Sequence, residues 1–452
     1  MQSAALLRAA PLSPSDKLLG NLEQLARAAP ANSGIAVFDL ASGTPVFLHN
    51  AEKPLKPASV MKVLTSAVAL EDLGPEFQFR TEFLVEAPLT SGRVQNLYVK
   101  GGGDPALTVE ELWKISRNLG LLGVRQIDNV ILDDSGFNSG RSPVGQRAYQ
   151  TGSSALAFNH DSLGFMVCPT QSGREARVET VPPEIQPRIE GRIQTSSSEA
   201  ATFTIDELYQ QGGQLAFKIG GAIPKDQECE TFYRSVVDPV SYLGQTFRGI
   251  LKQTGVNLLS GYRGGKTPVG AKVLYAHLSP PLSEILKDLN HFSNNFIAEQ
   301  LLYAIGAHLS GNFEREAGLK RLEQYLISLG VSAASVRVVD ASGLSHSSRL
   351  SASAVARVLK RMAELDSVRP EFENSLSVGG RSGTLKRRDF GLVSGATVRG
   401  KTGTLDGVSS LAGYLSCTSG RKLVFAILIN DAPSKEAAER LENQIVKSLS
   451  DL

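Results

Sequence analysis

The chain has few cysteines and no long apolar run, and these absences exclude several classes of protein. Its 452 residues include 3 cysteines (Cys168, Cys229 and Cys417), too few for a disulfide-stapled fold. A single bridge between Cys168 and Cys229 and a set of unpaired core thiols are both compatible with the sequence. No apolar run approaches the roughly 18 residues of a membrane-spanning helix, and the longest, Leu423 to Ile429, indicates a buried strand.

An excess of one charge is lacking as well. Lys plus Arg number 47 against 45 for Asp plus Glu, so the chain has no basic bias typical of proteins that bind nucleic acids or anionic membranes. Ordinary contents of glycine (43) and proline (21) exclude collagen-like and low-complexity chains. The 6 histidines show no metal-ligand spacing, and we expect no metal and no cofactor.

The N-terminal stretch, MQSAALLRAAPLSPSD, lacks the charged segment followed by an apolar core that defines a signal peptide. The protein is therefore either cytoplasmic or has had a signal peptide removed. The residues alone leave these two compartments open.

The two ends of the chain have the pattern of two halves of one domain. Segments with helical or strand periodicity are Lys17–Ala28, Gly34–Leu40, Pro45–His49, Gly395–Lys401, Ser409–Cys417, Lys422–Asn430 and Lys435–Leu449. The first and last of these read as helices and the rest as strands. Together they predict one antiparallel sheet, built from both ends and covered by helices.

The middle of the chain differs from its ends in composition and in hydrophobic pattern. Residues of about 84 to 275 are rich in Val, Thr, Gly and Pro and contain short alternating runs such as Val94–Val99, which indicate inserted β-rich modules. We predict an α+β catalytic domain with a helical subdomain over 15–83 and 276–452. One inserted domain is expected over 84–164 and 251–275, with a second nested inside it over 165–250.

Ser59 and Lys62 are the first candidate catalytic residues. The apolar run Val60–Leu70 predicts a buried helix, and Pro57 suits a helix start, so Ser59 would lie in the first turn with Lys62 on the same face. A desolvated lysine beside a serine can turn an unreactive hydroxyl into a nucleophile. The same Ser-x-x-Lys spacing also occurs at Ser419–Lys422, where a hairpin turn is the better interpretation.

A second element, Lys401-Thr402-Gly403-Thr404, ends a strand-like run. Gly403 allows a ligand to approach the strand closely. Lys401 offers positive charge to an anionic substrate, and Thr402 and Thr404 offer hydroxyl groups. Taken alone, the motif is equally compatible with an ordinary solvated strand end.

A third element, Ser293-Asn294-Asn295, precedes the amphipathic stretch Phe296–Leu309. Ser-x-Asn is common by chance and also occurs at Ser116–Asn118. However, Ser-x-x-Lys, Ser-x-Asn and Lys-Thr-Gly in this order form the signature of penicillin-binding proteins and class A β-lactamases. The order of the three elements therefore indicates acyl-transfer chemistry.

At these residues the sequence resembles the low-molecular-mass class C penicillin-binding proteins, which are serine D-alanyl-D-alanine carboxypeptidases and endopeptidases. Members of that family carry two extra domains in the interval that here separates Lys62 from Ser293. Further family-like stretches are Gly101–Pro105, Ser153–Asn159, Asp340–Ser345 and Gly383–Arg388. The resemblance covers essentially the whole chain and implies the transpeptidase fold shared with serine β-lactamases.

The resemblance implies a role for each motif. Ser59 would be the nucleophile and Lys62 its general base, with Ser293 passing a proton to the leaving amine and Asn295 orienting Lys62. The backbone N–H groups of Ser59 and Thr404 would form the oxyanion hole.

Substrate binding is implied at two places. Lys401, Thr402 and Thr404, with Gly403 between them, would hold the terminal carboxylate. Relatives commonly have Asp-Gly-Ser-Gly-Leu-Ser followed by Arg near the side chain of the peptide. Here Ala341 replaces the first Gly and His346 stands at the Arg position, while Leu344 is retained. Preference for a diaminopimelate-type stem peptide therefore stays open.

The same resemblance implies partners and compartment. We expect peptidoglycan stem peptides and crosslinks as substrates, β-lactam antibiotics as covalent inhibitors, no nucleic acid and no transmembrane segment. Because peptidoglycan lies outside the cytoplasm, we expect a periplasmic or otherwise exported protein whose signal peptide has been removed. Two alternatives remain open. One is a β-lactamase, although no segment convincingly supplies a deacylating Glu. The other is a non-catalytic cell-wall scaffold on the same fold.

Overall fold

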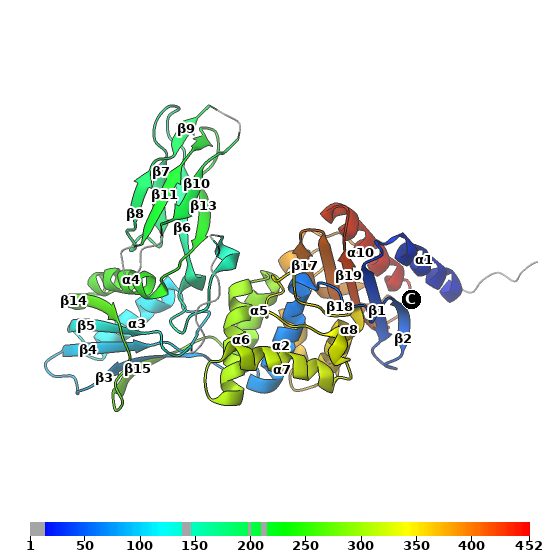
Figure 1. Cartoon of the computed structure of the whole chain (residues 1–452), viewed down its shortest axis with the longest axis horizontal. Helices are drawn as coiled ribbons and strands as arrows, with labels where there is room; N and C mark the ends of the chain where they lie inside the picture. Colours follow the sequence, from blue (N-terminus) through cyan, green and yellow to red (C-terminus); the bar gives the residue numbers. More distant parts are fainter. Residues whose placement is uncertain (1–13, 138–144, 146, 198–199, 209–214) are drawn as a thin grey trace, which may run out of the picture. The chain divides into compact units, whose positions relative to one another are not determined.

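The computed structural model describes residues 14–137, 145, 147–197, 200–208 and 215–452 (Figure 1). The chain divides into two compact units. Of the described residues, the first contains 14–71, Leu286–Ser293 and Leu319–Leu452, and the second contains those within Asp72–Ile285 and Asn294–Gly318. Segments from both halves of the sequence thus belong to the first unit, while the boundaries predicted for three separate domains stay a prediction.

The first unit is built on a six-stranded antiparallel sheet with the order β16-β17-β18-β19-β1-β2. Its strands are β1 (Ser33–Asp39), β2 (Pro45–His49), β16 (Ser377–Val378), β17 (Thr397–Leu405), β18 (Val408–Ser416) and β19 (Lys422–Asn430). Strand β1 pairs with β19 from Ser33 opposite Ile429 to Asp39 opposite Leu423. Strands from opposite ends of the chain therefore adjoin inside one sheet, which confirms the prediction.

The α-helices in the described parts of the chain are α1 (Pro14–Ala28), α2 (Met61–Leu73), α3 (Val109–Leu121), α4 (Pro239–Gln253), α5 (Leu282–His291), α6 (Asn295–Ser310), α7 (Arg315–Ser328), α8 (Ala352–Glu364), α9 (Arg369–Ser375) and α10 (Lys435–Ser450). Short 3-10 turns are η1 (Ala58–Val60), η2 (Ala148–Gln150), η3 (Asn159–Asp161), η4 (Ala333–Ser335) and η5 (Gly383–Leu385). Among the described residues, no helix is long and apolar enough to span a membrane.

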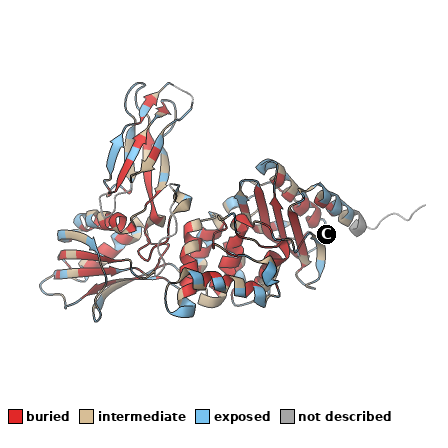
Figure 2. Ribbon diagram, viewed as in Figure 1, coloured by how far each residue is buried: buried red, intermediate tan, exposed pale blue. Residues whose placement is uncertain are grey.

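Helices cover both faces of the six-stranded sheet. On one face, Leu22 of α1 and Ile445 of α10 share a core with alternate residues of the strands. On the other face, the hydroxyl of Tyr414 in β18 donates to the carbonyl of Leu359 in α8 at 2.7 Å. Strands β18 and β19 are buried along almost their whole length (Figure 2), as the apolar run of β19 predicted.

The second unit contains a five-stranded mixed sheet with the order β14-β5-β4-β3-β15. Its strands are β3 (Arg80–Val85), β4 (Arg93–Lys100), β5 (Gln126–Asp133), β14 (Asn257–Gly264) and β15 (Lys272–Leu278). Helices α3 and α4 pack on it, because Ile115 and Phe247 share a core with Phe83 and Leu97.

Smaller sheets complete the second unit, with the orders β13-β6-β7, β10-β11-β8 and β12-β9. Their strands are β6 (Ser162–Cys168), β7 (Arg177–Val181), β8 (Arg188–Gly191), β9 (Gln194–Ser196), β10 (Thr204–Glu207), β11 (Ala216–Gly220), β12 (Ala222–Pro224) and β13 (Glu230–Ser235). A disulfide joins Cys168 to Cys229, which settles the alternative that the sequence left open, while Cys417 is a buried free thiol. The prediction that the middle of the chain is rich in β structure is confirmed.

Candidate active site

Ser59 lies in a tight turn immediately before α2. The sequence predicts this residue in the first turn of an α-helix, but the structure places it in the 3-10 turn η1, and α2 begins at Met61. The physical reason is Ala58, whose left-handed φ of 47° is incompatible with a right-handed helix. Strained backbone of this kind persists where surrounding contacts over-determine it.

Two side chains of the sheet hold the segment that leads to Ser59. The hydroxyl of Ser410 donates to the carbonyl of Pro57 at 2.7 Å. The side-chain amide of Asn430 accepts from the backbone N–H of Lys56 at 2.9 Å and donates to the carbonyl of the same residue at 3.1 Å. Ser59 itself remains partly accessible.

Lys62 lies one helical turn after Ser59 and is fully buried. Its Nζ is 3.0 Å from the Oγ of Ser59 and donates to the carbonyl of Ser342 at 2.7 Å. The first distance is within reach for direct proton transfer between the two groups.

Asp340 organises the loop that provides the Ser342 carbonyl. Its carboxylate accepts from the hydroxyls of Ser342 at 3.0 Å and Ser348 at 2.9 Å, and from the backbone N–H of Ser345 at 2.8 Å. At Gly343 a Cβ would lie only 1.8 Å from the carbonyl oxygen of Ala58, so glycine is required where this loop meets the serine turn. Asp340 is therefore a positioning residue, a role that the sequence analysis does not assign to it individually.

The other two residues of this loop that the sequence singles out are more accessible. Leu344 is half-buried and His346 is exposed. The guanidinium of Arg349 donates to the backbone carbonyl of His346 at 2.6 Å, which fixes the backbone of the loop at the position where relatives carry Arg.

Strand β17 brings Lys401 and its neighbours to the serine turn. The sequence places these residues at the end of a strand, but β17 continues to Leu405 because its ladder with β18 extends to Leu405 opposite Val408. A Cβ at Gly403 would lie 2.8 Å from the backbone nitrogen of Ser59, so this strand and the serine turn are in direct contact.

Lys401 is fully buried, and its Nζ donates to the Oγ of Ser293 at 2.9 Å and to the carbonyl of Thr402 at 2.8 Å. Burial, together with repulsion from Lys62, holds the pKa of Lys401 well below its usual range. An arriving carboxylate would favour the charged form again. The site is thus electrostatically prepared for an anion.

Ser293 follows the end of α5 and has a left-handed φ of 54°. The structure therefore brings Ser59, Lys62, Ser293 and Lys401 together in the first unit. Asn295 is the first residue of α6 in the second unit, where its side-chain amide donates to the carbonyl of Tyr149 at 3.2 Å.

Thr384 also contacts this group of residues, since the Oγ1 of Thr402 donates to its Oγ1 at 2.8 Å. The sequence singles out only the stretch that contains it, Gly383–Arg388, as family-like. No spacing rule could have found this contact, because it joins a loop to a strand through the fold of the sheet.

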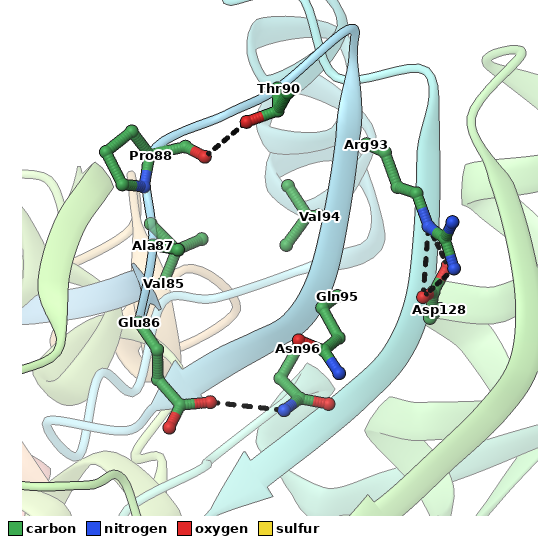
Figure 3. Close-up of a pocket in the computed structure, with 10 residues that line it drawn as sticks. All are labelled: Val85, Glu86, Ala87, Pro88, Thr90, Arg93, Val94, Gln95, Asn96 and Asp128. Carbon is green, nitrogen blue, oxygen red and sulfur yellow. Dashed lines mark hydrogen bonds and ion pairs between the residues drawn. The ribbon is translucent and has the colours of Figure 1, made fainter.

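A polar pocket in the second unit serves as a contrast (Figure 3). Its volume is about 440 Å³, and it lies at the β3–β4 hairpin. Each of its charged groups has a partner among the lining residues, because Arg93 contacts Asp128 at 2.6 Å and Glu86 accepts from the side-chain amide of Asn96 at 3.1 Å. None of the site residues predicted from sequence lines it. Across the described part of the chain, no cluster of His, Cys, Asp or Glu side chains could hold a metal ion.

Comparison with known proteins agrees with this geometry. The sequence matches the D-Ala-D-Ala carboxypeptidase 3 (S13) family over residues 16–452. It is 33% identical to the D-alanyl-D-alanine carboxypeptidase of Actinomadura sp. (strain R39), over 93% of this chain and 81% of the relative. It is also 24% identical to the D-alanyl-D-alanine carboxypeptidase DacB of Haemophilus influenzae, over 91% of this chain and 88% of the relative.

The structure superposes on penicillin binding protein 4 (dacB) from Haemophilus influenzae with a TM-score of 0.82 at 22% identity, covering 96% of this chain and all of the other. That likeness establishes an α+β penicillin-binding fold with additional β-rich inserted sheets, which confirms the predicted fold class. The resemblance seen in the motifs is confirmed by the match over nearly the whole chain. The protein belongs to the D-Ala-D-Ala carboxypeptidase 3 (S13) family.

Proposed function

We propose that this serine-type D-Ala-D-Ala carboxypeptidase cleaves peptidoglycan stem peptides and D-alanyl crosslinks through an acyl-enzyme on Ser59. The observation that carries the proposal is the 3.0 Å approach of Lys62 Nζ to Ser59 Oγ, with the buried side chain of Lys401 on the adjoining strand. A scaffold would gain nothing from burying two lysines, which costs stability.

In the first step, Ser59 Oγ attacks the carbonyl carbon of the penultimate D-alanine while Lys62 takes the hydroxyl proton. The bond from that carbon to the leaving amine then breaks, and the amine receives a proton through Ser293. Lys401, which donates to Ser293 Oγ, orients that hydroxyl. Water then hydrolyses the ester. From the family resemblance, Asn295 helps to orient Lys62.

The oxyanion that forms during the attack would be bound by two backbone N–H groups, those of Ser59 and Thr404. The close approach of Gly403 to the nitrogen of Ser59 supports this assignment, since it places the edge of β17 against the serine turn. Removing one preorganised donor of this kind lowers kcat by a factor of about 10²–10³.

The terminal carboxylate of the substrate would bind Lys401, Thr402 and Thr404. Lys401 supplies the charge, and the two threonines supply hydroxyl donors. From the family resemblance, we assign to Leu344 and His346, on the loop that Asp340 organises, the role of contacting the side chain of the peptide.

Export and inhibition by β-lactams are part of the proposal. The bond between Cys168 and Cys229 supports an oxidising compartment such as the periplasm, because disulfides are rare in reducing cytosol. This structure is similar, with a TM-score of 0.79, to that of the Haemophilus influenzae protein solved in complex with a novel beta-lactam. That complex supports covalent inhibition by β-lactams.

Intact-mass spectrometry with a penicillin tests the function. We expect one adduct per chain, mapped to the peptide containing Ser59, stable for many minutes and absent in Ser59→Ala. Muropeptides that end in D-alanyl-D-alanine or carry D-alanyl crosslinks should be cleaved by the same preparation. Rapid penicillin hydrolysis with no lasting adduct would instead indicate a β-lactamase, and neither adduct nor cleavage in a folded sample would indicate a scaffold.

A further inference from the structure

Thr384 belongs to a loop that the mechanism above does not use. Strand β16 is the edge of the six-stranded sheet and pairs with β17, with Ser377 opposite Gly400. The chain then turns into η5, which is anchored by the fully buried side chain of Leu385. This anchoring fixes Thr384 beside the strand that carries the proposed carboxylate-binding residues.

Three hydroxyl groups form a continuous chain at this place. Thr402 Oγ1 donates to Thr384 Oγ1 at 2.8 Å, and Thr384 Oγ1 lies 3.4 Å from the Oγ of Ser377, where either oxygen can be the donor. Ser377 is fully buried, and its Oγ accepts from the backbone N–H of Thr384 at 3.1 Å. At Gly383 a Cβ would lie 2.1 Å from Ser377 Oγ, so only glycine at this position permits the chain of contacts.

The direction of these hydrogen bonds matters for substrate binding. Each hydroxyl has a single proton to donate, and a carboxylate can only accept. Thr402 must therefore turn its proton from Thr384 to the substrate when a carboxylate binds. Thr384 can then donate to Thr402 and accept from Ser377, so that all three protons point toward the carboxylate. Hydroxyl rotors make this reversal without breaking a covalent bond, and each hydrogen bond in such a row polarises the next.

We propose that Thr384 is a positioning residue for the terminal carboxylate of the substrate and acts through the hydroxyl of Thr402. The proposal rests on the proposed function, since it requires a substrate that presents a carboxylate at β17. A purely structural threonine in the loop would affect all substrates alike. The positioning role predicts an effect that depends on the carboxylate.

The experiment compares Thr384→Val, which keeps the shape but removes the hydroxyl, with Thr384→Ser, which keeps the hydroxyl. Thr397→Val serves as the matched control, because Thr397 is exposed at the far end of the same strand. The substrates are a thioester that ends in a free carboxylate and the same thioester capped as its methyl ester. We measure kcat and KM for both.

For the carboxylate substrate, Thr384→Val should raise KM about ten-fold, the size expected for one hydrogen bond to a charged group. For the methyl ester, the same variant should change kcat/KM less than about two-fold, and Thr384→Ser should resemble wild type on both substrates. Equal losses on both substrates, or no loss on either, would overturn the proposal. Penicillin labelling of Ser59 in the same preparations separates the two hypotheses: a wild type that is not labelled refutes the proposed function, whereas normal labelling with equal losses refutes only the role of Thr384.

Discussion

The candidate site of the first unit and the polar pocket of the second treat charged side chains in opposite ways. In the site, Lys62 and Lys401 are fully buried and contact neutral hydroxyl and carbonyl oxygens. In the pocket, the guanidinium of Arg93 forms a bidentate ion pair with Asp128, donating from Nε to Oδ1 and from Nη2 to Oδ2 (Figure 3). Burying an ionisable group is costly, so the two buried lysines indicate chemistry, whereas the largely exposed ion pair of Arg93 indicates a structural role. The volume of a pocket does not make this distinction.

The largest expected effect concerns the base. Lys62→Arg should fold but lose at least about 10³-fold in the rate of acylation by a penicillin, because a guanidinium cannot accept the serine proton near neutral pH. Time-resolved intact-mass spectrometry measures the rate. Lys53→Arg is the matched control, since Lys53 donates to a backbone carbonyl outside the site. A near-normal rate in Lys62→Arg would exclude Lys62 as the base and weaken the contrast between the units.

The next effect concerns the substrate cation. Lys401→Met should lower kcat/KM for peptides ending in D-alanyl-D-alanine by about 10²-fold, because the carboxylate loses its charged partner. Steady-state kinetics with a peptide that ends in an amide provides the comparison. The loss on that peptide should be smaller, because it reflects only the orientation of Ser293 by Lys401. An equal loss on both peptides would show that Lys401 acts on the chemistry rather than on the carboxylate.

The same lysine predicts a pH dependence of stability. The pKa of Lys401 is lowered in the folded protein by burial and by Lys62, so the unfolded chain binds more protons at pH values between the lowered pKa and about 10.4. Wild-type stability should therefore rise with pH through this window relative to Lys401→Met, which does not titrate. Urea unfolding of both proteins at a series of pH values measures the difference. A difference that does not change with pH would contradict the lowered pKa.

A smaller effect on the site is expected from the disulfide. The bridge between Cys168 and Cys229 closes a loop with a sequence separation of 61, and its removal should cost about 4 kcal/mol in the free energy of unfolding by the chain-entropy estimate. The double variant Cys168→Ser, Cys229→Ser should nevertheless acylate Ser59 within about two-fold of wild type, because both cysteines lie in the second unit. Thermal unfolding and penicillin labelling give the two readouts. Strongly impaired labelling in the folded double variant would show that the second unit shapes the site.

The smallest effect is expected at the pocket. Arg93 is 61% exposed, so Arg93→Gln should change the free energy of unfolding by less than about 1 kcal/mol. Acylation should be unchanged as well. Denaturant unfolding and penicillin labelling test both statements, with Arg80→Gln, at another partly exposed ion pair of the same sheet, as control. A clear loss of acylation in Arg93→Gln alone would make the pocket part of the functional machinery.

Much of the fold could be predicted because its signals are local. The segment Lys422–Asn430 was expected as a strand and is β19 with the same bounds, since a strand between two layers of helices reads as a continuous apolar run. The bounds predicted for β17 were wrong, because Thr402, Gly403 and Thr404 carry no apolar strand signal and are kept in the strand by pairing with β18. Pairing of that kind has no signal in the residues themselves.

The sequence by itself determined the proximity of Ser59 and Lys62, because three residues of helical chain place two side chains on one face whatever the rest of the protein does. It also determined which strands lie in the core. Only the tertiary structure decided that Lys401 meets Ser293 across a separation of 108 residues and that Thr384 meets Thr402. It likewise decided the left-handed backbone of Ala58. The physical reason is that such contacts depend on the order of strands in the sheet and on close packing between segments distant in the chain, which no local periodicity encodes.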